Sequence, residues 1–243
     1  MTGSGHIAQG LPCQDAHVVR ILGGGELVMA VADGCGSARR AEEGARCAVE
    51  VSTRFIADRL DKGVPSDAEG CAMLLEEALT QTVLVVRSLV LDSDPNEVAT
   101  TLLLTLVTDE WLATVQVGDG ATVCRSASGE LTVVSRSNRG DFVNETTFLT
   151  SPGFESDVCR MTVPSGDITG VASFTDGVEI LGVQLQGGAA HEPFFAPLFG
   201  FASNPDSTEG ELREFLSSER VCERTDDDKT LILAVRGEFR GDE

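Results

Sequence analysis

Residues 99–119 read "ATTLLLTLVTDEWLATVQVGD", and this stretch decides the fold class. Two apolar runs, 99–107 and 111–119, are separated by three polar residues. Branched apolar runs joined by a short polar turn predict two paired antiparallel strands. The pattern repeats at once, because 121–126 and 130–135 flank another short turn and predict a second hairpin.

The rest of the chain adds strands in groups and helices in blocks. The predicted strands are 17–22, 26–32, 157–163, 167–176 and 229–236, and the predicted helices are 38–61, 70–91, one that begins within 177–185, and 207–219. Successive strands with short turns favour antiparallel sheets, and blocks of helices favour layers on the sheet faces. The order therefore predicts a layered α+β sandwich rather than a doubly wound parallel sheet. Residues 136–157, polar and then aromatic, fit equally a flap beside a site and an ordinary surface loop.

Composition excludes several classes of partner and compartment. The 243 residues suit one large domain or two small ones, and 39 acidic against 18 basic residues give a net charge of −21. Such a surface repels nucleic acid and anionic membranes, so we expect neither as a partner. The seven cysteines are scattered without a CxxC pair, which favours reduced thiols in the cytoplasm over disulfides or zinc. The N-terminus lacks a signal-peptide pattern, and no apolar run is long enough to span a bilayer.

Aspartate recurs where apolar runs end. Asp33, Asp119 and Asp176 each follow such a run and precede a glycine, Asp15 precedes the first strand, and 226–228 are three aspartates before the last. A single Asp-Gly is a common hairpin turn signal, and each of these could be only that. The repeated choice of aspartate instead favours carboxylates that converge at sheet ends. Such an oxygen-only site suits Mg²⁺ or Mn²⁺, and two of these ions could activate a water and clamp a phosphoryl group.

Five motifs in order resemble one known family. They are "PCQDA", "VADGCGSA", "ATTLLLTLV" with "WLATVQVGDG", "FTDGVE" and "DDDKTLILAV". The chain resembles the PPM-type (type 2C) metal-dependent serine/threonine protein phosphatases, in a bacterial-style branch. The resemblance runs nearly end to end, so we expect a single domain over 1–243. It implies a four-layer αββα sandwich, two antiparallel sheets flanked by helices, with the metal site at one edge of the sheets.

The resemblance also implies a binuclear centre of Mg²⁺ or Mn²⁺. Asp33 matches the position that bridges both metals, and the carbonyl of Gly34 matches a ligand of one of them. Asp176 and Asp227 match the ligands of the other metal. Counting back three positions from Thr230 selects Asp227 rather than Asp228.

Two further aspartates complete the implied site. Asp15 matches a residue that orients a metal-coordinated water, and Asp119 matches the position linked to a third, weaker metal. The implied catalytic residues are therefore Asp15, Asp33 and Asp176. The implied reaction is hydrolysis of phosphoserine and phosphothreonine in proteins by a metal-activated water. The implied partners are a phosphoprotein and a cognate serine/threonine kinase, and no heptad or long apolar face predicts anything but a monomer.

The sequence departs from the better-known eukaryotic members at three points. Gln14 stands where many have a metal-binding Glu, and Cys35 stands where many have a His that acts as general acid. The expected basic residue before the first motif is missing, and only His6 is offered there. These departures motivate an alternative, a catalytically weak pseudophosphatase that binds phosphoproteins as a regulator. A third hypothesis is a hydrolase of small phosphate esters. The retained aspartates favour the enzyme, because buried carboxylates without a metal are costly.

Overall fold

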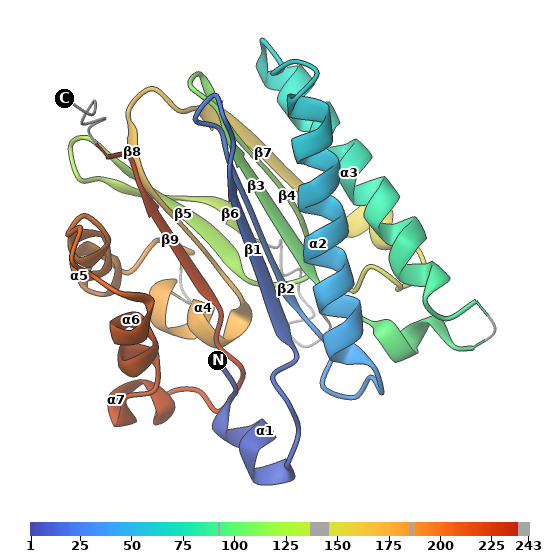
Figure 1. The fold of residues 1–243 in the computed structure, drawn as a ribbon. Coiled ribbons are helices and arrows are strands. Elements are labelled where there is room, and N and C mark those ends of the chain that lie inside the picture. The colour runs from blue at the N-terminus through green and yellow to red at the C-terminus, as the bar shows by residue number, and fades with distance from the viewer. Residues whose placement is uncertain (92, 137–145, 185–186, 238–243) are drawn as a thin grey trace.

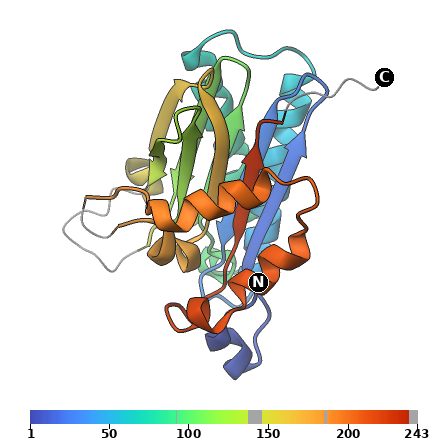
Figure 2. The ribbon, with the colours of Figure 1, turned by 90° about the vertical axis from the view of Figure 1, so that its left-hand side faces the viewer.

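Two antiparallel sheets lie face to face between layers of helices in the computed structural model, which describes residues 1–91, 93–136, 146–184 and 187–237 (Figures 1 and 2). The first sheet has the order β1-β2-β3-β4-β7, with β1 Asp15–Ile21, β2 Leu27–Asp33, β3 Leu102–Val107, β4 Trp111–Val117 and β7 Cys159–Pro164. The second has the order β6-β5-β8-β9, with β5 Ala121–Ser126, β6 Leu131–Arg136, β8 Ile168–Phe174 and β9 Leu231–Val235. All pairings between these strands are antiparallel.

The helices divide between the two outer faces. The first sheet is covered by α2 Ala41–Leu60 and α3 Ala68–Ser88 (Figure 1). The second is covered by α4 Asp176–Gly182, α5 Glu192–Ala202, α6 Glu209–Leu216 and α7 Glu219–Cys222 (Figure 2). The short α1 Ser4–Gln9 lies beyond the layers (Figure 1), whereas the 3-10 helices η1 Pro95–Val98 and η2 Phe154–Asp157 each add a buried residue to the core beneath α2 and α3. None of the helices in the described ranges is both long and apolar enough to cross a membrane.

Three separate apolar cores account for the four layers. Along β2, Val28 and Ala30 face α2 and α3, whereas Met29 and Val31 face the second sheet. A strand buried on both faces needs no polar alternation, which explains the unbroken run "LVMAVA". The third core lies between the second sheet and the C-terminal helices, where Phe174, Phe195 and Phe199 are fully buried.

The α+β class and the two flanked antiparallel sheets are confirmed, and the differences are local. The predicted helix at 207–219 is two helices, α6 and α7, because the chain turns at Ser217 and Ser218. Helices α1 and α5 were not predicted. Helix α5 carries Pro197 in its interior, which removes one backbone donor and disguises the helical pattern. Much of the candidate flap at 136–157, residues 137–145, lies outside the described residues.

A cluster of three hydroxyl groups joins the facing sheets. Thr105 of β3 lies 3.0 Å from the hydroxyl of Thr122 and 3.2 Å from that of Ser173, and the latter two are 2.9 Å apart. All three residues are buried, so each hydroxyl depends on the other two for its hydrogen bonds.

Thr105→Val should lower the free energy of unfolding by about 1–2 kcal/mol, because it leaves two buried hydroxyls with one partner fewer. Urea unfolding followed by circular dichroism measures the change. Thr80→Val is the matched control, since the Thr80 hydroxyl is exposed and bonds only to the preceding helical turn. If both variants unfold at the same urea concentration as the parent, the cluster does not stabilise the sheet interface.

Candidate metal centre

The start of β1 and the end of β2 bring two aspartates to one sheet edge. Asp15 and Asp33 are direct partners in the antiparallel register of these strands. Antiparallel pairing is what places the first residue of one strand beside the last residue of the next.

Thr100 and Thr101 fix the backbone at Asp33. The N–H of Asp33 donates to Thr101 Oγ1 at 2.9 Å, and its carbonyl accepts from the N–H of Thr101 at 2.8 Å and from Thr100 Oγ1 at 3.0 Å. The next residue, Gly34, has no room for a side chain, because a Cβ there would lie 2.6 Å from the carbonyl oxygen of Ala41. The Thr-Thr pair therefore positions Asp33 through its main chain.

Asp119 lies in the link that crosses from the first sheet to the second. It joins β4 to β5 between Gly118 and Gly120, whose φ angles of 92° and 93° favour glycine. A Cβ on Gly120 would also lie 2.5 Å from the carbonyl oxygen of Phe174. The hydroxyl of Thr146 donates to Asp119 Oδ2 at 2.8 Å, so the described end of the candidate flap contacts this carboxylate.

Asp176 is the first residue of α4, and Thr175, the N-cap of that helix, is the residue between it and the end of β8. The hydroxyl of Thr175 donates to Asp15 Oδ2 at 2.8 Å and accepts from the N–H of Thr230 at 3.1 Å. The side chain of Thr175 thus links the start of β1 in the first sheet to the end of β8 and the start of β9 in the second. Because Thr175 bonds to Asp15 and directly precedes Asp176, it keeps these two aspartates close together.

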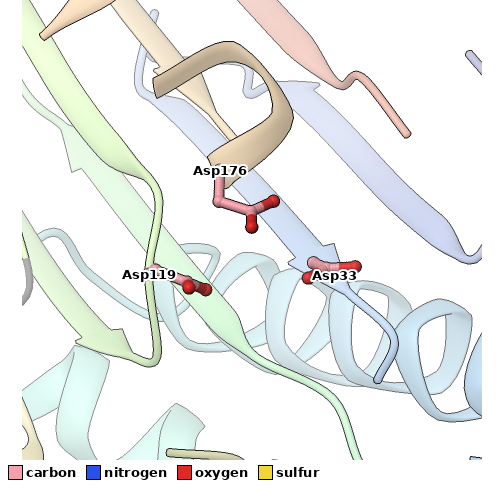
Figure 3. A group of neighbouring side chains, drawn as sticks. All are labelled: Asp33, Asp119 and Asp176. Carbon is pink, nitrogen blue, oxygen red and sulfur yellow. The ribbon is translucent and has the colours of Figure 1, made fainter. Parts of the chain in front are cut away.

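The structure brings Asp33, Asp119 and Asp176 into one group, with carboxylate oxygens that all lie within 4.8 Å of one another (Figure 3). All three side chains are half-buried. They come from the end of β2, from the β4–β5 link and from the start of α4, so both sheets contribute (Figure 3). Asp15 lies next to Asp33 in the strand pairing. Asp227 is not one of the group of three, but its charge raises the pKa of Asp33.

The two neighbouring aspartates before β9 have different surroundings. Asp227 is exposed, and its Oδ1 accepts from the N–H of Asp228 at 2.8 Å. Asp228 is buried and accepts from the N–H groups of Gly3 and Gln14, each at 2.6 Å, while His6 Nδ1 lies 3.0 Å from its Oδ2. Burial alone would raise the pKa of Asp228, but these bonds hold it below its ordinary value. Asp228 therefore fastens the N-terminal segment, a role that the run of three aspartates did not reveal.

Crowding of carboxyl groups raises their pKa values. Burial, followed by the charges of Asp119, Asp227 and Asp15, raises the pKa of Asp176 from 3.8 to about 8. Burial and then the charge of Asp15 raise the pKa of Asp33 still further above its ordinary value. Burial also raises the pKa of Asp15, although bonds from the Thr175 and Thr230 hydroxyls oppose the rise. Together these groups cannot all remain ionised without a cation.

The donor set fits a hard divalent cation. The group offers only oxygen atoms, which Mg²⁺ and Mn²⁺ prefer. Two further oxygens nearby, Asp15 Oδ1 and Gln14 Oε1, are buried and have no hydrogen-bond partner among the described residues. Buried acceptors of this kind normally have a partner, and a cation with its waters would supply one.

Comparisons with known proteins show the family of the chain. A family model described as protein phosphatase 2C matches residues 2–217. Serine/threonine-protein phosphatase 3 of Escherichia coli K12 is 33% identical over 252 residues, covering 97% of this chain and 96% of that protein.

Solved structures share the fold at low identity. A sex-determining protein of C. elegans superposes with a TM-score of 0.70 at 14% identity, covering 98% of this chain and 64% of that one. The phosphatase Stp1 of Staphylococcus aureus superposes with a TM-score of 0.60 at 12% identity, covering 93% and 89%. The chain belongs to the protein phosphatase 2C family of serine/threonine protein phosphatases.

Proposed function

We propose that the aspartate group is the active site, where phosphoserine and phosphothreonine in proteins are hydrolysed with two divalent cations, Mg²⁺ or Mn²⁺. The observation that carries the proposal is the convergence of Asp33, Asp119 and Asp176 from both sheets. Family membership supplies the reaction class, since these phosphatases are metal-dependent and act on phosphoproteins. We further propose one domain over 1–243, a monomer in the cytoplasm, and a serine/threonine kinase as the opposing partner.

The residues that would hold the cations are those of the sheet edge. Asp33 would bridge two ions, the carbonyl of Gly34 would bind one, and Asp176 and Asp227 would bind the other. Asp227 supports this assignment because its charge acts on both Asp33 and Asp176. Asp119 would hold a third, weaker ion. When bound, the cations lower the pKa of a coordinated water and neutralise the phosphoryl oxygens.

Asp15 would orient the attacking water. Thr175 fixes Asp15 Oδ2, and the buried Oδ1 is an acceptor without a hydrogen-bond partner among the described residues. A carboxylate with one oxygen fixed and one free can hold a water in a single orientation. Asp15 would therefore act by alignment of the nucleophile.

Two variants separate the enzyme from its alternatives. Asp176→Asn should lower Mn²⁺-dependent hydrolysis of p-nitrophenyl phosphate and of a phosphothreonine peptide by at least about a hundredfold. The exposed Asp206, between α5 and α6, gives the matched control Asp206→Asn, which should keep full activity. EDTA should abolish activity in parent and control.

The outcomes distinguish three hypotheses. Activity that survives EDTA or Asp176→Asn would contradict the proposed mechanism. Metal binding by calorimetry without turnover of any phosphoester would favour the pseudophosphatase. Turnover of the small ester with inert peptides would favour a small-molecule hydrolase.

The pH dependence of stability should reveal the crowded carboxyls. Because the pKa of Asp176 is about 8 in the folded protein and near 3.8 when unfolded, the folded state binds more protons between these values. In EDTA, the free energy of unfolding should therefore fall as pH rises from about 4 to about 8. Excess Mn²⁺ should restore stability at the upper end, because it binds only the folded site. Asp176→Asn should flatten the pH dependence in EDTA; an unchanged slope would contradict the raised pKa.

Gln14→Glu tests the neutral amide beside the site. Gln14 Oε1 is a buried acceptor without a partner among the described residues, and a carboxylate there would add a negative charge next to Asp15. The variant should bind Mn²⁺ more tightly by about tenfold, and the metal-free protein should unfold at lower urea concentration. Gln9→Glu, on the exposed surface of α1, is the matched control. Equal Mn²⁺ affinity of both variants and the parent would show that position 14 does not face a cation.

A further inference from the structure

A cavity of about 640 Å³ lies on the outer side of the second sheet, between α4, α5, α6 and α7. Its volume is in the range of sites that bind small organic ligands. Most of its wall is apolar, and all four helices contribute to it. The buried Leu198 of α5 and the buried Val183, which follows α4, are part of this wall. None of the residues that line the cavity belongs to the aspartate group or to a strand of the first sheet.

The apolar wall continues into the core and out to the surface. Phe194 packs edge-on against the buried Phe195, with centroids 5.1 Å apart, and lies 6.2 Å from Phe215. At the mouth, Ile180 is 54% exposed and Phe215 is 38% exposed. Large apolar side chains exposed around a concavity are typical of a binding site.

Two arginines and one glutamate line the cavity, so its wall carries a net positive charge in a protein whose net charge is −21. Arg220, in α7, and Arg224, in the turn that follows α7, both line the cavity. Neither guanidinium has an ion-pair partner among the described residues. The acidic residue in the wall, Glu211, already accepts from the N–H and hydroxyl of Thr208 at 2.8 and 2.9 Å.

We propose that this cavity binds a small amphipathic carboxylate, an apolar chain that ends in one anionic group. The apolar body would lie against Phe194, Leu198 and Phe215, and the carboxylate would meet Arg220 and Arg224. Two guanidiniums in the wall of an apolar cavity complement this ligand and disfavour a cation. The occupant would touch α4 at Ile180, one helical turn from Asp176 at the start of the same helix.

Calorimetric titration of the full chain with three ten-carbon probes tests the site. Monomeric decanoate should bind saturably at one site and more tightly than decanol, and decyltrimethylammonium should not bind there. The double variant Arg220→Ala, Arg224→Ala should weaken decanoate binding about fivefold to tenfold and leave decanol unchanged. Arg213→Ala is the matched control, because Arg213 is exposed on α6 and pairs with Glu209 outside the cavity.

A second variant does not depend on the arginines. Ile180→Trp should narrow the mouth at an exposed position and lower decanoate affinity, with an unfolding midpoint like that of the parent. The proposal is overturned if decanoate and decanol bind equally in parent and double variant, or if no probe binds saturably. Binding only to phosphatidylglycerol vesicles would assign the surface to a membrane and also overturn it. None of these measurements uses hydrolysis, so their outcome is independent of the proposed function.

Discussion

Mutual repulsion among carboxylates is the constraint on which the rest of the structure depends. Asp15, Asp33, Asp119 and Asp176 are held together although each raises the free energy of its ionised neighbours. Their backbone surroundings provide the opposing force. Strand pairing fixes Asp15 beside Asp33, and the β4–β5 link fixes Asp119 through two glycines with positive φ. A cation bound among these carboxylates would offset their repulsion. The folded state would therefore be more stable with the cation bound than without it.

Threonine hydroxyls carry much of that restraint. Thr101 holds the N–H of Asp33, and Thr175 links Asp15 to the N–H of Thr230 across the two sheets. Asp228 adds the N-terminal segment to the same network through Gly3 and Gln14. The main chain closes the link, because Met1 and Lys229 exchange backbone hydrogen bonds. The site is therefore held from both ends of the described chain, and its residues need no direct contact with one another to stay aligned.

The sequence predicted those parts of the molecule that rest on local pattern. The hairpins of β3 with β4 and β5 with β6 follow from apolar runs and short turns, and the layered α+β class follows from their order. Helix α5 was not predicted from the sequence, because Pro197 and several phenylalanines obscure the helical spacing of its apolar residues. The recurrence of aspartate after apolar runs predicted which carboxyls could converge. It could not show that Asp119 joins Asp33 and Asp176 more closely than Asp227 does, because that depends on how the two sheets face each other. The different surroundings of Asp227 and Asp228 likewise arise from the N-terminal segment, more than two hundred residues away in sequence.

Gln14 shows how one neutral side chain adjusts this balance. Its N–H is held by Asp228, so the backbone beside Asp15 stays in place whatever the side chain carries. An amide at this buried position adds an oxygen donor without adding to the repulsion around Asp33. The metal-free protein is then less strained than one with a carboxylate there, and a bound cation is attracted less strongly. In the proposed centre both effects would lower the affinity for the cation, so Gln14 would ease release of the metal while the fold stays intact.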